Sequence, residues 1–391
     1  RGITLFVNTT LRRNTTLIDW AADAHRRGII RANTYVIDLD SVKKNAAMLA
    51  KEAKNNKLGL YFMTKQIGRN PVICDAIVRA GIERAVAVNM TDARVLHKNG
   101  IKIGHIGHLV QIPASEMNDA LNMQPDVITV MDIENAQKVS LSAAHLGYTQ
   151  RILLRVIDND DIVYPGQQGG FSLEEIKNTV ELIGSMPNIE ISGVTTFPCF
   201  TLNRTGTKIL STNNFETLNK ADEILKSVGI KMAQVNAPGG NCIDMFKIAA
   251  DGGATQLEPG HAFTGTTYLN SLDDECAEIP AMIYVTEVSH NWRGESYVFG
   301  GGFYARGLVN KAIVVSKSNV KNVVEAYSVN PENIDYYARL GYRANVGDTV
   351  ICSFRTQLFV LSSNIAVVRG LASGAPELMG IFDREGREAC I

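Results

Sequence analysis

The sequence predicts an α/β protein: a TIM-type (β/α)8 barrel followed by a C-terminal, mainly antiparallel β domain. Between residues 58 and 257, eight apolar runs typical of strands alternate with helical stretches. Eight such units, each of roughly 20 to 40 residues, favour a closed parallel barrel. An open doubly wound sheet is the alternative, and it would usually have fewer strands. From about residue 272, short alternating strands separated by Gly-Asp and Asn turns indicate antiparallel pairing.

The elements follow one another in a regular order. The expected barrel strands are residues 58–64, 85–88, 105–111, 127–130, 152–157, 189–195, 232–235 and 255–257. Helices are expected at 71–80, 172–185, 214–228 and 243–250, among others. A helix over 12–32 and a strand over 34–39 precede them, and Asp40 is expected to cap the next helix. The predicted domains are an N-terminal helical segment (1–33), the barrel (34–270) and the β domain (271–391).

Composition excludes several classes of protein. The chain is 45% hydrophobic and 20% charged, with a net charge of −1, so neither a basic nucleic-acid surface nor a polybasic membrane patch is expected. No apolar run approaches the roughly 20 residues that span a bilayer. Six scattered cysteines without a CxxC pair indicate neither a zinc cluster nor a disulfide framework. The N-terminal residues show no signal-peptide pattern, and a cytoplasmic protein is expected.

The first barrel strand ends at a lysine. Lys65 directly follows the apolar run 58–64, and Asn70 with Pro71 then provide an N-cap and a proline at the first helical position. Lys65 is therefore expected at the edge of the barrel where ligands bind. An amine that is partly desolvated there becomes a usable nucleophile. For this stretch alone, an ordinary loop lysine is the alternative.

Two glycine-rich turns follow the seventh and eighth strands: VNAPGGN at 235–241 and LEPGHAFTGTT at 257–267. Phosphate groups in TIM barrels often sit between these two loops. Glycine lets backbone N–H groups approach phosphate oxygens, and a helix N-terminus adds a favourable dipole. A lysine at one strand end and a phosphate site at the same edge together suggest pyridoxal phosphate (PLP), with the lysine as its covalent partner.

These segments resemble those of the fold-type III PLP enzymes, which include alanine racemases, D-amino-acid enzymes and the ornithine/diaminopimelate decarboxylases. The chain is most similar to the YhfX-like group. The matching segments are TYVIDLDSVKKNAAML at 34–49, YFMTKQIGRNP at 61–71, GVTTF at 193–197, VNAPGG at 235–240 and LEPGH at 257–261. The resemblance implies a Schiff base at Lys65 and a homodimer in which the β domain completes the neighbouring subunit's active site. It also implies cofactor contacts from Asn236, Gly239, Gly240, Asn241, Glu258, Gly260, His261 and Tyr268.

Glu258 is the most informative residue after Lys65. Its position in the family faces the pyridine nitrogen of the cofactor, and a carboxylate there keeps that nitrogen protonated. A protonated ring is a strong electron sink, whereas alanine racemases place arginine at this point. LEPGH is similar to the Glu-Pro-Gly-Arg turn of the decarboxylases, with His261 where arginine usually stands. A loop glutamate that caps the next turn is the alternative for Glu258.

Other positions depart from the family pattern. Phe299 falls near the second-base tyrosine of alanine racemases, and phenylalanine cannot transfer a proton. Gln168 stands about where those racemases carry an arginine near the cofactor. Cys352 lacks the following aspartate of the decarboxylases. The His-x-Cys zinc pair of D-serine dehydratase-like enzymes is absent there as well, and no metal site is expected.

Several residues are candidates for acid–base chemistry or substrate binding. The predicted catalytic residues are Lys65, Cys199, His261 and Tyr304, and Tyr297 and Cys352 are further candidates for a second proton carrier. His261 has a residue type whose ordinary pKa suits proton transfer. His105 and His108 are three apart on a predicted strand and should face opposite sides, so one is expected to be structural. Arg69 and Arg155 are candidates for binding a substrate carboxylate, with ordinary ion pairs as the alternative.

The resulting functional expectation is a PLP-dependent enzyme that acts at the Cα of an amino acid, as a racemase or epimerase. A decarboxylase or lyase is the first alternative, favoured by Glu258. A PLP-binding protein without turnover is the second, but the small barrel proteins of that kind lack a β domain. A phosphate-sugar barrel enzyme that uses Lys65 is the third. The expected partners are an amino acid or amine and a second copy of the chain, with neither nucleic acid nor membrane.

Overall fold

The structure is a computed structural model that describes residues 6–203, 205–273, 275–307, 309–327 and 332–389. Its contacts divide the chain into a barrel unit, 48–64 with 81–260, and a sheet unit, 1–47 with 65–80 and 261–391. Each unit is assembled from separate stretches of the chain, and each is described here by itself. The continuous domain boundaries predicted from the sequence stay predictions.

The barrel unit contains a parallel sheet in the order β2-β12-β11-β8-β7-β6-β5-β4-β3. Its strands are β2 (Gly59–Leu60), β3 (Phe62–Met63), β4 (Arg84–Val86), β5 (Lys102–Ile106), β6 (Val127–Val130), β7 (Gln150–Arg155), β8 (Ile189–Thr195), β11 (Gln234–Asn236) and β12 (Gln256–Leu257). β2 and β3 are one run of chain interrupted at Tyr61, and they pair with β12 and β4 respectively. The sheet therefore closes on itself as an eight-stranded barrel, which confirms the predicted fold.

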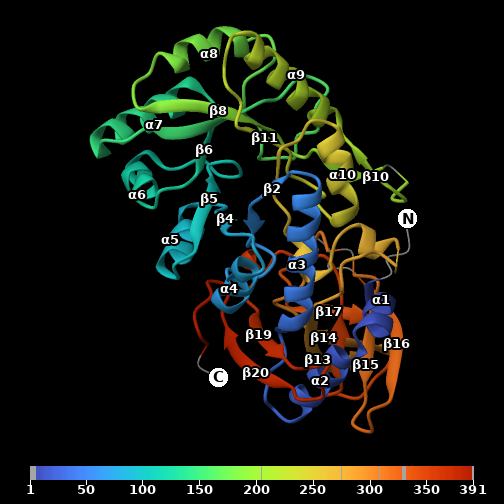
Figure 1. Cartoon of the computed structure of the whole chain (residues 1–391). Helices are drawn as coiled ribbons and strands as arrows, with labels where there is room; N and C mark the ends of the chain where they lie inside the picture. Colours follow the sequence, from blue (N-terminus) through green and yellow to red (C-terminus); the bar gives the residue numbers. More distant parts are fainter. Residues whose placement is uncertain (1–5, 204, 274, 308, 328–331, 390–391) are drawn as a thin grey trace. The chain divides into compact units, whose positions relative to one another are not determined.

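Helices connect the barrel strands, and α5, α7, α8 and α9 pack on neighbouring strands (Figure 1). The helices of this unit are α5 (Met90–Lys98), α6 (Met117–Asn122), α7 (Ile133–Leu146), α8 (Ile176–Gly184), α9 (Asn213–Ser227) and α10 (Ile243–Asp251). Helix α9 shows the underlying pattern, since Phe215, Leu218, Ala221 and Leu225 recur at helical spacing and are buried. A hairpin of β9 (Phe200–Leu202) and β10 (Ile209–Ser211) precedes α9 and was not predicted.

The sheet unit contains a mainly antiparallel sheet in the order β14-β17-β16-β15-β18-β13-β1-β19-β20. Its strands are β1 (Thr34–Asp38), β13 (Met282–Trp292), β14 (Glu295–Phe299), β15 (Lys311–Val315), β16 (Lys321–Tyr327), β17 (Tyr337–Leu340), β18 (Thr349–Cys352), β19 (Asn364–Arg369) and β20 (Glu377–Phe382). An additional pairing of β14 with β13 closes six of these strands into a ring. β1 pairs antiparallel with β13 and parallel with β19, so a strand from before the barrel completes the C-terminal sheet.

Two N-terminal helices pack on this sheet, α1 (Phe6–Arg13) and α2 (Thr15–Arg26). The single helix predicted over 12–32 is therefore wrong. Asn14 interrupts it, because its side chain accepts the Leu17 N–H and caps α2, while its amide donates to Asp38 at 3.0 Å. The core of this unit joins α2 to the strands through Leu17, Ile18, Ala21, Val36, Ile283, Val285, Ile313, Ile351 and Ala366.

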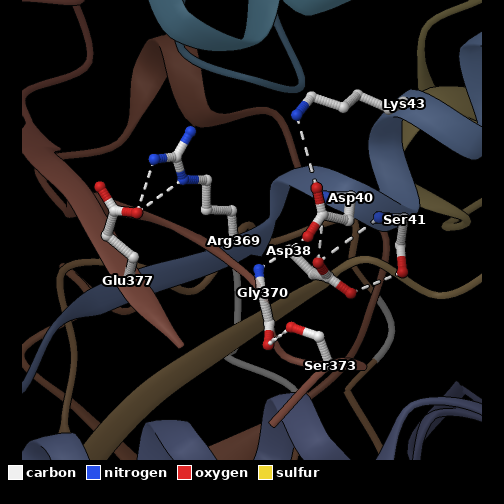
Figure 2. Close-up of polar contacts among 8 residues, drawn as sticks. All are labelled: Asp38, Asp40, Ser41, Lys43, Arg369, Gly370, Ser373 and Glu377. Atoms are coloured by element: carbon white, nitrogen blue, oxygen red, sulfur yellow. Dashed lines mark hydrogen bonds and ion pairs between the residues drawn. The ribbon is translucent and has the colours of Figure 1, made fainter. Parts of the chain in front are cut away.

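Helix α3 (Leu39–Asn55) begins two residues earlier than the sequence suggested. Asp38, rather than the predicted Asp40, caps it: Asp38 Oδ1 accepts from the backbone N–H groups of Asp40 (3.1 Å) and Ser41 (3.4 Å). Asp40 lies in the first turn, where its carboxylate accepts the Gly370 N–H at 2.7 Å (Figure 2). Asp40 therefore links the helix to the end of β19. Among the described residues, no helix is long and apolar enough to cross a membrane.

Candidate active site

A buried carboxylate lies at the carboxyl edge of the barrel. Glu258 directly follows β12, and its Oε1 accepts hydrogen bonds from His105 Nδ1 (2.5 Å) and Asn236 Nδ2 (2.7 Å). Its backbone N–H donates to Asn241 Oδ1 at 3.0 Å. Glu258 Oε2 is buried and has no hydrogen-bond partner among the described residues. Buried polar atoms are normally paired, so one carboxylate oxygen is held by the protein and the other is left for a ligand.

His105 is the partner of this carboxylate, a role that the sequence did not predict. It lies on β5 with its side chain fully buried, and its Nε2 is 2.5 Å from Thr129 Oγ1. With Glu258 ionised, Nδ1 must be the donor, so His105 fixes the orientation of the carboxylate. The prediction that His105 and His108 face opposite sides is wrong, since their rings lie 5.3 Å apart. β5 ends at Ile106, and the chain turns at Gly107, whose φ is 87°.

Buried polar side chains form a row across the neighbouring strands. Arg155 is in register with Thr195, and Thr195 is in register with Asn236, so the three share one face of the barrel sheet. Each has a buried atom without a partner in the described part of the chain: Arg155 Nε, Thr195 Oγ1 and Asn236 Oδ1. With Glu258 Oε2, this edge of the barrel presents both donors and acceptors to a polar ligand.

Arg155 is the charged member of this row. Only 3% of it is exposed, its Nη2 donates to the Gln167 carbonyl at 2.7 Å, and none of the ion pairs among the described residues includes it. Burial lowers the pKa of its guanidinium below the ordinary value. A buried charge without a counter-ion is costly, so an anionic ligand would stabilise this position. Gln168, by contrast, is exposed to solvent.

The first glycine-rich turn has a backbone that only glycine adopts readily. Gly239 and Gly240 have φ values of 110° and 59°. A Cβ at Gly240 would lie 2.9 Å from the Phe200 carbonyl oxygen. Asn241 holds the turn through its amide, which donates to the carbonyls of Ala237 (3.1 Å) and Gly239 (3.2 Å). These hydrogen bonds hold the turn, which leads directly into α10.

Cys199 is less suited to proton transfer than the sequence suggested. It is fully buried in the barrel unit, where its Sγ lies 3.9 Å from the Thr196 carbonyl oxygen. Burial, with smaller contributions from Asp161 and Glu258, raises the pKa of its thiol well above the ordinary value. A thiolate at this position is therefore disfavoured at neutral pH.

In the sheet unit, Lys65 lies two residues after β3 and is half-buried. Its carbonyl accepts the Phe359 N–H at 3.1 Å. Asn70 caps α4 (Pro71–Arg79) as predicted, accepting from Val72 and Ile73. Arg69 Nη1 donates to the Arg384 carbonyl at 2.9 Å, and its guanidinium lies 5.6 Å from the Phe359 ring centre. Arg69 would therefore have to give up these contacts within the protein in order to bind a substrate carboxylate.

His261 begins the short helix α11 (His261–Thr264), and its Nδ1 is 3.0 Å from Thr266 Oγ1. Burial, followed by the positive charges of Arg355 and Lys65, lowers the pKa of His261 well below its ordinary value. This corrects the expectation of a histidine that titrates near neutral pH. At pH 7 the imidazole is neutral, and its lowered pKa makes it a weaker base than an ordinary histidine.

The remaining candidates also lie in the sheet unit. Tyr304 is half-buried, in a loop after β14. The ring of Tyr297 stacks on His290 with centroids 4.9 Å apart. Cys352 is buried in β18, where burial raises its pKa to about 12. Phe299 ends β14 and is 38% exposed.

The depressed pKa of His261 predicts a stability that falls in acid. Below about pH 6.5 the unfolded chain protonates this histidine while the folded chain does not, so the unfolded state gains stability as pH falls. The limiting slope is about 1.4 kcal/mol per pH unit for one proton. Urea unfolding from pH 7.5 to 5.5 should show a smaller slope in His261→Gln than in the unchanged protein. His25, whose pKa burial also lowers, contributes equally to both proteins, and equal slopes would contradict the prediction.

The fold defines a class of protein. The alanine racemase N-terminal domain family matches residues 37–267, and the YhfX-like C-terminal domain matches residues 283–378. The chain belongs to the alanine racemase-like family, whose members use PLP. More particularly, it is 38% identical over 383 residues to the uncharacterized protein YhfX of Escherichia coli (strain K12), across 98% of this chain and 99% of that protein. The resemblance expected from the sequence is thus confirmed.

Solved structures share the fold at low sequence identity. Alanine racemase of Clostridium difficile 630, in complex with cycloserine, has a TM-score of 0.63 and 16% identity, covering 90% of this chain and 98% of that chain. D-threonine aldolase from Filomicrobium marinum has a TM-score of 0.63 and 14% identity, covering 92% and 96%. D-threo-3-hydroxyaspartate dehydratase from Delftia sp. HT23 has a TM-score of 0.64 and 14% identity, covering 89% and 97%. In the described part of this chain, no three His, Cys, Asp or Glu residues are grouped to hold a metal ion.

Proposed function

We propose that this protein is a PLP-dependent enzyme that acts at the Cα of an amino acid, with Lys65 as the point of covalent attachment. The observation that carries the proposal is the buried Glu258 carboxylate, held by His105 and Asn236 with Oε2 left open. An acceptor of this kind suits the protonated nitrogen of a pyridine ring. Membership of a family whose members use PLP supports the same cofactor.

The residues present fit that cofactor. Met63 N–H donates to the Pro259 carbonyl at 2.8 Å, so the strand that precedes Lys65 in the sequence ends beside the residue that follows Glu258. The turn of Gly239, Gly240 and Asn241, followed by Gly260 and His261 after the last strand, would bind phosphate, as predicted. When bound, PLP supplies an electron sink for negative charge at the substrate Cα. Asn236 and Tyr268 complete the proposed set of binding residues.

The protein's own residues then divide the work. Glu258 holds a proton at the ring nitrogen, and Arg155 binds the substrate carboxylate through its guanidinium. Lys65 Nζ moves a proton at one face of Cα. Racemisation or epimerisation needs a second carrier on the other face. Tyr304 is the better candidate, because burial disfavours the thiolates of Cys199 and Cys352 and lowers the pKa of His261 well below its ordinary value.

A decarboxylase or lyase is the second candidate, since such reactions can use one face of Cα only. Two observations favour it: a carboxylate at Glu258 rather than the arginine of alanine racemases, and the high pKa of both candidate thiols. We also propose a cytoplasmic homodimer in which the β domain completes the partner's site. A PLP-binding protein without turnover would keep the cofactor and show no exchange at Cα.

The experiment that tests the function combines a spectrum with isotope exchange. Purified protein should show a visible cofactor absorption band, and a panel of D- and L-amino acids in deuterated water should reveal exchange at Cα. Inversion with exchange indicates racemisation or epimerisation, whereas released carbon dioxide or a lost side-chain group indicates the second candidate. Protein that neither carries nor takes up PLP would contradict the proposal.

A further inference from the structure

His261, in the second glycine-rich turn, is close enough to two cationic side chains of the same unit for their charges to lower its pKa. The charges of Arg355 and Lys65 both act on His261, which lies within the turn and begins α11. Arg355 comes from the loop after β18, more than 90 residues further along the chain. Two like charges beside a half-buried histidine repel one another. An anion bound by Arg355 would offset the charge of its guanidinium.

Arg355 has no counter-ion in the part of the chain that the structure describes. Its guanidinium lies over the ring of Tyr268, with Cζ 3.5 Å from the ring centre. Among the described residues it makes no ion pair, and its buried Nε has no hydrogen-bond partner. Stacking on an aromatic ring holds the planar guanidinium in one orientation and leaves its edge, with the N–H donors, for another group. This is a binding geometry rather than a structural ion pair.

The turn itself adds hydroxyl groups that can bind oxygen. Thr266 Oγ1 lies 3.0 Å from His261 Nδ1 and 2.9 Å from Thr264 Oγ1. Gly265, with φ of 60°, has no room for a side chain, because a Cβ there would lie 2.2 Å from the Ile279 carbonyl oxygen. A guanidinium edge and hydroxyls around a fixed turn are complementary to a phosphate monoester, which carries several acceptor oxygens and close to two negative charges.

We propose that Arg355 binds the phosphate group of the cofactor and replaces the arginine that the decarboxylases carry at the position of His261. The turn has His261 where the decarboxylases have arginine, and Arg355 of the same chain's β domain would supply the positive charge instead. The inference rests on the proposed function for the source of the phosphate. The site itself rests on Arg355, Tyr268 and the turn, and it can be tested with inorganic phosphate alone.

The test compares PLP with pyridoxal, which has the same aldehyde and ring but no phosphate. Equilibrium dialysis should show that Arg355→Gln weakens PLP binding about tenfold to a hundredfold, the usual effect of losing a charged hydrogen bond. Pyridoxal binding should stay within about twofold, since the ring and Lys65 are unchanged. Arg355→Lys keeps the charge without the planar fork and should fall between these values. Arg343→Gln, an exposed arginine of the same unit, is the matched control.

A second arm needs no covalent attachment. Inorganic phosphate, compared with chloride at equal ionic strength, should raise the unfolding temperature of the apo protein and of Arg343→Gln but not that of Arg355→Gln. Equal losses for PLP and pyridoxal, or unchanged phosphate stabilisation in a folded Arg355→Gln protein, would overturn the assignment. If neither aldehyde attaches to the unchanged protein, the proposed function fails. In that case stabilisation by phosphate, and its loss in Arg355→Gln, would still support the phosphate site.

Discussion

Replacing Lys65 with alanine should abolish covalent attachment of PLP while leaving the protein folded. Lys65 lies beyond the end of β3 and is half-buried, so it contributes little to the core. The change in the free energy of unfolding should therefore stay within about 1 kcal/mol. The chemical effect is complete, because no other group replaces the nucleophilic amine. The visible absorption band should disappear, and Cα exchange with any substrate should fall to background.

The measurement is borohydride reduction followed by peptide mapping. In the unchanged protein the cofactor should be fixed to the peptide that contains Lys65, whereas Lys65→Ala should carry no label there. Lys57→Ala is a suitable control, since Lys57 is an exposed lysine just before β2. It should keep full labelling and the absorption band. Labelling of the same extent in Lys65→Ala would place the attachment elsewhere and remove Lys65 from the mechanism.

The barrel was predictable because its information is local. Each strand is an apolar run that ends in a turn, and Asn70 and Asp132 cap helices where the sequence indicated. The prediction of a single helix over 12–32 was wrong because of another local signal, the N-cap at Asn14. Asparagine is favourable at an N-cap and unfavourable inside a helix. The hydrogen bond from Asn14 to Asp38 further stabilises the cap.

The pairings that make the site are not local. His105 and Glu258 are 153 residues apart, and nothing in the HxxH pattern indicates that one histidine bonds to a glutamate that follows another strand. The placement of β1 between β13 and β19 is hidden for the same reason. When the sheet closes, residues that are far apart in the sequence come together because their strands pair in a particular register. Sequence could predict Glu258 through family resemblance, but not the partner that orients it.

Environment is the other quantity that the sequence hides. His261 is a histidine of ordinary appearance until Arg355 and Lys65 are placed beside it. Cys199 and Cys352 look like possible bases until their burial is known. In each case the residue type suggested a pKa, and the surroundings moved it in the direction that desolvation or like charge requires. Proton-transfer roles are therefore the part of the site that sequence predicts least well.

Replacing Glu258 with glutamine should nearly abolish turnover while sparing cofactor binding. The amide keeps the shape of the side chain, and its oxygen can still accept from His105 Nδ1 and Asn236 Nδ2. That arrangement turns the amide N–H₂ toward the place of Oε2, so a donor replaces the acceptor that faces the ligand. A ring nitrogen that meets a donor stays unprotonated and is a weaker electron sink. The lost stabilisation of negative charge at Cα, several kcal/mol, corresponds to about a thousandfold or more in rate.

The decisive comparison is between rate and occupancy in the same preparations. Glu258→Gln should retain PLP, with an absorption band altered by the change at the ring nitrogen, and should lose Cα exchange. Glu190→Gln, an exposed glutamate on β8, should lose neither. His105→Gln separates the positioning of the carboxylate from its charge. This variant keeps the Glu258 carboxylate but loses its 2.5 Å histidine partner, so its turnover should fall less than that of Glu258→Gln. Turnover in Glu258→Gln equal to that of the unchanged protein would show that Glu258 does not address the ring, and the chemistry at Cα would then need another source of stabilisation.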